Sequence, residues 1–221
     1  MKATNYVTIP RDKIPNMYPG DEVYLKDADN NLYKLEIKYD ECPESPREWD
    51  NVCTILSGKG HWNIADEGFA MTREEADEIL NKPDTYYKPI YMYEHGGQTI
   101  SLSPFGDPWD SGLCGFIFVT KDRMKAEGFD VSTDEIWHKK AAEIMDAEVE
   151  VYDSYIQGET YGYVLSKAIR VDHSAETGKD WSTMEFEEED SCYGFYGGNI
   201  ATNGILDSIP CDFEFIDLKE E

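Results

Sequence analysis

The chain has 221 residues, of which 46 are acidic and 20 are lysine or arginine, so its formal net charge is −26. A hydrophobic content of 40% is enough for a buried core and argues against a largely disordered protein. The negative charge repels phosphate backbones and anionic lipids, so we expect neither a nucleic acid nor a membrane as the direct partner. Basic protein surfaces are the expected partners, although acidity also serves solubility alone.

The sequence indicates a cytosolic protein. No apolar run approaches the roughly 18 residues that a membrane span needs, and the first residues lack the apolar stretch of a secretory signal. The cysteines are widely spaced and form no Cys-x-x-Cys pair, which argues against a zinc ribbon or a redox dithiol. We therefore expect reduced thiols at Cys42, Cys53, Cys114, Cys192 and Cys211.

The N-terminal part of the chain predicts a β-hairpin. Residues 22–26 and 32–39 alternate apolar and polar side chains around the turn-rich stretch DADNN. The next segment, residues 40–51, is charged and contains two prolines, so we expect it to be irregular. A short strand is expected directly after it, at residues 52–57.

A Thr72–Glu75 capping box predicts the start of a helix, which ends before Pro83. Apolar patterning then predicts three strands, at residues 86–95, 98–103 and 114–120. The first two strands are joined at Gly96–Gly97. The third is the most apolar, so we expect it near the centre of a sheet.

The best-defined helix is expected at about residues 133–157. A second capping box, Ser132–Glu135, marks its start, and Gly158 marks its end. At 100° per residue, apolar side chains fall on one side of this helix and four carboxylates on the other. The apolar side consists of Trp137, Ala141, Ile144, Met145, Val149, Tyr152 and Ile156.

The remaining elements complete an α+β pattern. We expect a strand at residues 159–171, a polar loop at 172–190, a short helix within 199–209 and a closing strand at 211–218. The fold class is therefore α+β, with a mainly antiparallel sheet, one long amphipathic helix and one or two shorter helices. No linker is evident, so we expect a single domain over residues 35–221. Residues 1–34 form an N-terminal extension that holds the start of the hairpin.

Five segments carry a resemblance to a known family. They are SPREWDN (45–51), YEHGG (93–97), PWDSG (108–112), EVYDSYIQGETYG (150–162) and DSCYGFYG (190–197). With them the chain resembles, over roughly residues 35–198, an uncharacterised family of hypothetical proteins from bacteriophages and mobile elements of gut and Gram-positive bacteria. It departs from the family pattern in EHGG, where the family has DHSG, and in SGLCGFI, where the family has SGQVGFI. The resemblance implies a phage or mobile-element origin, hence a bacterial host cytosol, and implies no activity.

The loop before the most apolar strand holds the candidates for catalysis. Asp107 and Asp110 flank Trp109, and the preceding turn offers Glu94 and His95. If these groups meet, they could bind a divalent metal and activate water, as in a small metal-dependent hydrolase or nucleotide-processing enzyme. The favoured interpretation is structural, with both aspartates accepting backbone N–H groups and Trp109 buried. No HExxH, P-loop or nucleophile-elbow motif names a reaction.

Glu148 is unusual because it falls within the apolar side of the predicted helix. A buried carboxylate must find partners, or its pKa rises. We expect Glu148 to meet a lysine, an arginine or a tyrosine hydroxyl. The alternative is that it serves as a general acid or base.

Acidic runs are the candidates for partner binding. They comprise Glu143, Asp146, Glu150 and Asp153 on the helix, and Glu187, Glu188 and Glu189 farther along the chain. The helix acids span about 15 Å at 1.5 Å per residue, so their spacing is similar to that of nucleic-acid phosphates. Together the two runs could present a phosphate-like array to a basic groove, although a solvated helix face explains the first run equally well.

Aromatic side chains in irregular or glycine-flanked segments could stack on a ligand or a partner, or belong to the core. They are Trp49, Tyr93, Trp109, Tyr193, Phe195 and Tyr196. We expect a non-enzymatic anti-defence protein that binds and inhibits a host nuclease of a CRISPR or restriction system. Its acidic surface supplies the electrostatic attraction, and Trp49 and Trp109 anchor the contact. No cofactor is expected.

Overall fold

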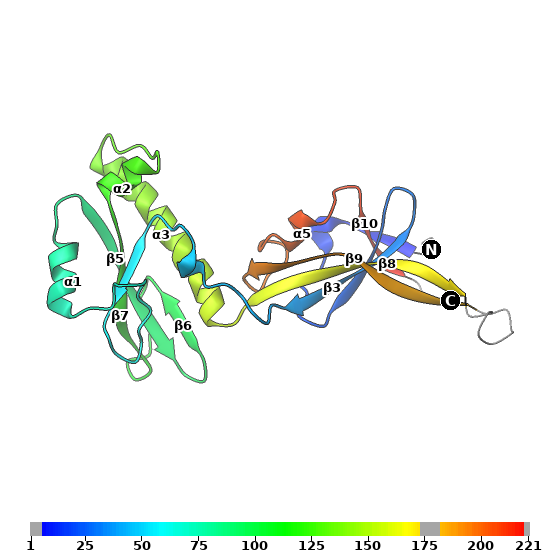
Figure 1. Cartoon of the computed structure of the whole chain (residues 1–221), viewed down its shortest axis with the longest axis horizontal. Coiled ribbons are helices and arrows are strands. Elements are labelled where there is room, and N and C mark those ends of the chain that lie inside the picture. Colours follow the sequence, from blue (N-terminus) through cyan, green and yellow to red (C-terminus); the bar gives the residue numbers. More distant parts are fainter. Residues whose placement is uncertain (1–5, 173–181, 219–221) are drawn as a thin grey trace. The chain divides into compact units, whose positions relative to one another are not determined.

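The structure is a computed structural model and describes residues 6–172 and 182–218. The chain divides into two units (Figure 1). Unit 1 consists of Met1–Pro43 and Glu159–Glu221, and unit 2 consists of Glu44–Gly158. Each unit has one antiparallel sheet, and four α-helices occur among the described residues, so the predicted α+β class is confirmed.

Unit 1 is built on a six-stranded sheet with the order β1-β10-β2-β3-β8-β9. Its strands are β1 (Tyr6–Ile9), β2 (Glu22–Lys26), β3 (Leu32–Tyr39), β8 (Thr160–Asp172), β9 (Ser182–Tyr196) and β10 (Glu214–Leu218). The unit also contains a 3-10 turn, η1 (Arg11–Lys13), and the short helix α5 (Ile205–Ser208). The predicted hairpin is confirmed as β2–β3, with Leu25 opposite Tyr33.

The main core of unit 1 lies on one face of this sheet, and a smaller buried cluster around Leu32, Ala168 and Ile216 lies on the other. Leu25, Leu35 and Ile37 are fully buried in the main core, and the segment around α5 covers them with Ile205 and Leu206. Because side chains alternate along a strand, the charged residues between these core positions point to the other face. This alternation is the pattern from which the hairpin was predicted.

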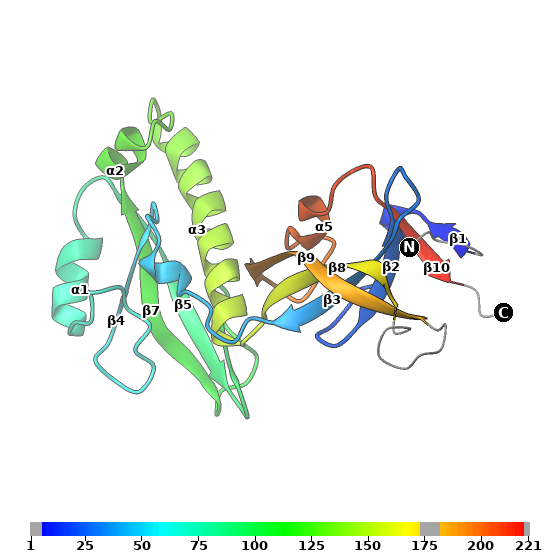
Figure 2. The ribbon, with the colours of Figure 1, turned by 45° about the vertical axis from the view of Figure 1, so that its right-hand side comes forward.

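The predicted loop at residues 172–190 is wrong where the structure describes it. Asp172 ends β8, and residues 182–190 form the first part of β9, which pairs with β8 along its length (Figure 2). The run EFEEED lacks apolar alternation because β9 is the edge strand and most of its side chains are exposed. Backbone pairing with β8 places it in the sheet, and Phe186 alone of this run packs against a buried cluster. Residues 173–181 of the predicted loop lie outside the described residues.

Unit 2 has a four-stranded sheet with the order β4-β7-β5-β6. The strands are β4 (Thr54–Ser57), β5 (Thr85–Glu94), β6 (Gln98–Ser101) and β7 (Ser111–Thr120). The helices are η2 (Pro46–Glu48, a 3-10 turn), α1 (Arg73–Leu80), α2 (Lys121–Ala126) and α3 (Asp134–Ile156). α3 covers one face of the sheet and α1 the other (Figures 1 and 2).

α3 is the predicted long helix, and its apolar side is buried as expected. Trp137, Ala141, Met145 and Val149 pack against the central strands in the main core of unit 2. The predicted N-terminal cap is wrong by one residue. The Thr133 hydroxyl, rather than that of Ser132, accepts the hydrogen bond from the N–H of Ile136.

The division of the chain differs from the expected single domain over residues 35–221 with an extension at 1–34. Strand β3 crosses residue 34, and β1 pairs with β10 near the other end of the described chain. Unit 2 is inserted between β3 and β8, which are neighbours in one sheet. An insertion of this kind needs no long linker, so composition does not reveal it. Among the described residues, no helix is long and apolar enough to cross a membrane.

Candidate functional site

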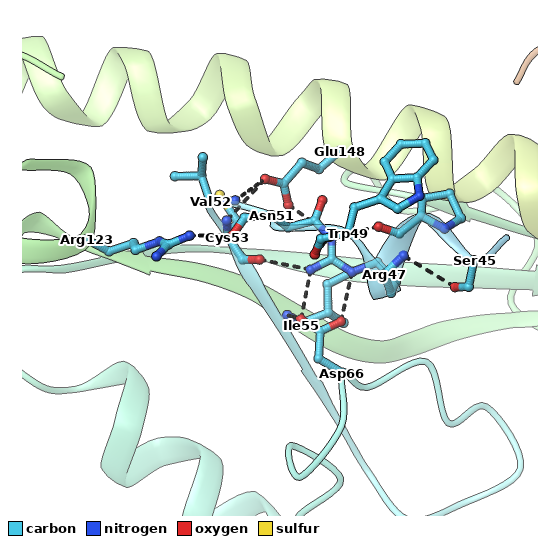
Figure 3. A network of polar contacts seen from close by, with 11 residues as sticks. Ser45, Arg47, Trp49, Asn51, Val52, Cys53, Ile55, Asp66, Arg123 and Glu148 are labelled. Atoms are coloured by element: carbon cyan, nitrogen blue, oxygen red, sulfur yellow. Dashed lines mark hydrogen bonds and ion pairs between the residues drawn. The ribbon is translucent and has the colours of Figure 1, made fainter. Parts of the chain in front are cut away.

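A buried ion network holds the segment SPREWDN onto α3 (Figure 3). The Arg47 guanidinium donates two hydrogen bonds of 2.8 Å to the Asp66 carboxylate and one of 2.9 Å from Nη1 to Oε2 of Glu148. The Arg47 side chain is only 7% exposed and that of Glu148 12%. Burial opposes the guanidinium charge, but the two carboxylates outweigh it, so the pKa of Arg47 lies above its ordinary value.

Glu148 has the arginine partner that its position in the sequence predicts. Its second oxygen, Oε1, accepts the N–H groups of Val52 and Cys53 at 3.0 and 3.1 Å. Because both oxygens are engaged by groups of this fold, the geometry supports a structural role and gives no support to the acid–base alternative. Burial, followed by the charge of Glu148, raises the pKa of the Cys53 thiol.

The same segment is fixed at its end by Asn51 and Arg123. The Asn51 amide donates to the carbonyl of Pro46 at 2.8 Å, and Arg123 of α2 donates to the carbonyl of Asn51 at 3.1 Å. Arg123 also pairs with Asp50 at 2.9 Å. The SPREWDN segment is therefore held in place by hydrogen bonds and ion pairs within unit 2. Trp49, which sits within it, is 42% exposed.

Two of the catalytic candidates, His95 and Asp110, meet at one end of the unit 2 sheet. β5 and β7 are antiparallel neighbours, so the end of β5 lies beside the start of β7, and Glu94 N–H donates to Asp110 O at 2.8 Å. This pairing brings His95 Nδ1 within 2.8 Å of Asp110 Oδ2. The contact between His95 and the loop, which the sequence left as a hypothesis, is present.

Glu94 faces a different set of partners. Trp62 Nε1 donates to it at 2.6 Å, Gln98 Nε2 at 3.0 Å, and His61 Nε2 lies 3.1 Å away. These contacts, that of Trp62 first, hold the pKa of Glu94 below its ordinary value. Sequence reasoning missed His61 and Trp62 because they come from the loop after β4, and no local pattern links that loop to β5.

Asp107 behaves as the structural interpretation predicted. Its Oδ1 accepts the N–H groups of Trp109 at 2.8 Å and of Asp110 at 3.2 Å, and the Ser111 hydroxyl donates to its carbonyl. The turn is therefore rigid. Trp109 projects from it with 90% of its surface exposed, so it is free to contact a partner and is not part of the core.

The imidazoles and carboxylates at this sheet end lie in pairs. Within residues 6–172 and 182–218, no group of three or more His, Cys, Asp or Glu side chains could hold a metal ion. The imidazoles of His61 and His95 each have a carboxylate beside them, and both are largely exposed.

The helix acids are placed unequally. Asp153 Oδ1 accepts the Ile100 N–H at 2.7 Å and the Thr99 hydroxyl at 2.9 Å, so it fixes the edge strand β6. Glu143 pairs with Lys140 at 3.0 Å, and Asp146 pairs with Lys88 at 2.7 Å. Glu150 is exposed on the same helix. Local cations and hydrogen bonds thus offset much of the charge of this face.

The second acidic run lies in unit 1 and is more open. Glu185, Glu187, Glu188, Glu189 and Asp190 are all exposed on β9. Asp190 accepts the Tyr163 hydroxyl at 2.7 Å, and Glu189 lies 4.0 Å from Lys167. Because the two runs belong to different units, each is a separate candidate surface.

No protein-family model, no curated protein and no solved structure matches this chain. Its candidate sites therefore stand on their own geometry.

Proposed function

We propose that the protein is a non-enzymatic inhibitor encoded by a phage or mobile element and acting in the host cytosol. Its proposed target is a nuclease of a CRISPR or restriction system, bound on the basic surface that holds nucleic acid. The observation that carries the proposal is the acidic part of β9, residues 185–190, in which every residue except Phe186 is an exposed carboxylate. We call these residues the β9 acidic strand.

The spacing of the β9 acidic strand supports mimicry of a nucleic-acid backbone. An antiparallel strand advances about 3.4 Å per residue, so five carboxylates lie along roughly 17 Å. Phosphates follow one another at about 3.4 Å of helix axis along each DNA strand. The linear charge density of the β9 acidic strand is therefore close to that of one DNA strand. The charge density of α3 matches less well, because lysines neutralise part of it.

The position of the strand in the sheet supports access. β9 is an edge strand that pairs with β8 on one side only. Between Leu165 and Ser166 of β8 the register shifts, which inserts Glu189 as an extra residue in β9. Such a bulge twists the strand and turns neighbouring side chains in different directions. Carboxylates are thus presented on both faces of the edge.

Cleavage assays test this proposal directly. The purified protein is added to restriction nucleases and to assembled CRISPR effector complexes, and cleavage of labelled DNA is followed at low and at high salt. We expect inhibition of at least one nuclease, overcome by excess DNA and weakened steeply by salt, since both ligands compete for the same cations. Inhibition that salt and excess DNA leave unchanged would contradict a mimicry mechanism.

A further inference from the structure

Unit 1 contains a surface hollow of about 600 Å³ that the nuclease proposal does not use. It lies where β3 and β9 end, and Tyr39, Asp40, Glu41 and Tyr193 contribute to its lining. The exposed fraction of Tyr39 is 60% and that of Tyr193 is 48%. A large aromatic ring that faces solvent beside carboxylates is an unusual combination, because exposed aromatic residues are characteristic of binding surfaces. We call this feature the tyrosine hollow.

The strand pairing holds Tyr193 in place. Tyr193 lies opposite Gly162 of β8, and a Cβ added at Gly162 would be 2.2 Å from its ring. The ring therefore rests directly on the glycine backbone, where any side chain would displace it. The next residue, Gly194, has a φ of 88° and forms a second bulge in β9, which glycine permits at little cost.

Tyr39 is supported in a similar way from the neighbouring strand. Its ring lies 5.7 Å from that of Tyr161, the residue opposite it on β8. Tyr161 is itself buried in the core of unit 1. Because Tyr161 and Gly162 are adjacent on β8, the side chains of Tyr39 and Tyr193 leave the sheet on opposite faces. The Tyr193 ring is backed by the sheet before any ligand arrives, which lowers the entropy lost on binding.

The charges around the tyrosine hollow select for a cation. Asp40 Oδ1 accepts the Cys42 N–H at 3.0 Å, which fixes the loop that also carries Glu41. Lys38 is the basic residue of the lining, and its ammonium pairs with Glu36 at 3.0 Å. A cation on an aromatic face gains from the ring quadrupole, and nearby carboxylates add to that gain. The same carboxylates would repel an anionic ligand.

We propose that the tyrosine hollow binds an arginine side chain of a protein partner. A guanidinium is planar, stacks on aromatic rings and pairs with carboxylates at the same time, which an ammonium does less well. The inference rests on the proposed function for the identity of the partner, since a surface that holds nucleic acid presents arginines.

The β9 register connects the tyrosine hollow to the β9 acidic strand. Glu188, Ser191 and Tyr193 lie opposite Ser166, Val164 and Gly162, which alternate along β8. Glu188, Ser191 and Tyr193 therefore share one face of the sheet, and the Ser191 hydroxyl donates to Glu188 at 2.8 Å. A basic segment that follows this face meets carboxylates first and the tyrosine ring next.

The test uses the full chain and the peptide acetyl-Gly-Arg-Gly-Arg-Gly-amide, with its citrulline analogue as a neutral control of the same shape. Binding is measured by calorimetry and by NMR shifts of the tyrosine rings. We expect the arginine peptide to bind and to shift the ring signals of Tyr193. We expect Tyr193→Ala to weaken binding about five- to tenfold, while Tyr193→Phe retains it because the ring remains. Tyr87→Ala removes an exposed aromatic of unit 2 and should leave binding unchanged.

Equal binding of the citrulline peptide, or unchanged binding by Tyr193→Ala, would overturn the inference. If Tyr193→Ala fails to fold, the citrulline comparison on the wild-type chain decides alone. Peptide binding without inhibition of any nuclease would refute the proposed function and leave the tyrosine hollow intact. Nuclease inhibition without peptide binding would refute arginine binding by the tyrosine hollow and leave the proposed function intact.

Discussion

Arg47 and Glu148 are 101 residues apart in the sequence and form a buried ion pair, with Nη1 and Oε2 separated by 2.9 Å. The pair ties an irregular segment to the middle of α3. Asp66 completes the arrangement by accepting two hydrogen bonds from the same guanidinium and one from the N–H of Ile55. One arginine thus links three segments of unit 2 and holds SPREWDN in place, although its only regular structure is the single turn η2.

Replacing Glu148 should destabilise the protein strongly. Glu148→Gln leaves the buried Arg47 without one of its two counter-charges, and removing one partner of a buried pair costs about 3–5 kcal/mol. Asp66 still pairs with Arg47, so we expect a loss of about 3 kcal/mol in the free energy of unfolding, measured in urea. Glu150→Gln, an exposed control on the same helix, should change it by less than about 0.5 kcal/mol. Equal effects of the two variants would contradict a buried pair.

Asp153 should behave as a structural residue and not as part of a binding surface. Asp153→Ala removes the acceptor for the Ile100 N–H and the Thr99 hydroxyl. Loss of such an acceptor costs about 1–3 kcal/mol, which thermal or urea unfolding would detect. Nuclease inhibition at a temperature where the variant is folded should be unchanged. A variant of normal stability with weaker inhibition would reverse this assignment.

The thiols should fall into two classes of reactivity. Cys42, Cys192 and Cys211 are exposed, whereas Cys53 and Cys114 are buried. Burial raises the pKa of the Cys114 thiol to about 12 and also raises that of Cys53, so neither forms the reactive thiolate near neutral pH. Iodoacetamide followed by mass spectrometry should label three cysteines in the native protein and five in urea. Rapid native labelling of Cys114 would show that β7 is more accessible than the structure indicates.

Glu94 should titrate below its ordinary pKa of 4.5, because Trp62 and then Gln98 donate hydrogen bonds to its charged form. A carboxylate whose pKa is lowered by folding adds stability above its unfolded pKa, and this contribution disappears as the pH falls through the folded pKa. Trp62→Phe removes the first donor. NMR titration of the carboxyl carbon should show the midpoint rise toward 4.5 in that variant. An unchanged midpoint would mean that Trp62 does not hold Glu94 in solution.

Local patterns predicted most of the elements, since the hairpin β2–β3, the strands of unit 2 and α3 all follow side-chain periodicity. The same periodicity placed Glu148 among buried residues and so predicted a charged partner. It could not say that the partner is Arg47, because that contact depends on how a loop packs against a helix. Strand β9 was missed since its pairing depends on the backbone, and EFEEED carries no apolar signal. The insertion of unit 2 was missed for a related reason, because pairing of β3 with β8 is a long-range contact.

The most direct test of the account reverses the charge of the β9 acidic strand and compares it with an equal change elsewhere. The triple variant Glu187→Lys, Glu188→Lys, Glu189→Lys is matched by Glu74→Lys, Asp77→Lys, Glu78→Lys on α1, where the three acids are also exposed. Both variants change the net charge equally, and each is checked for folding by circular dichroism. We predict that nuclease inhibition is lost in the β9 variant and largely retained in the α1 variant. Equal inhibition by the two folded variants would contradict the claim that β9 is the binding surface.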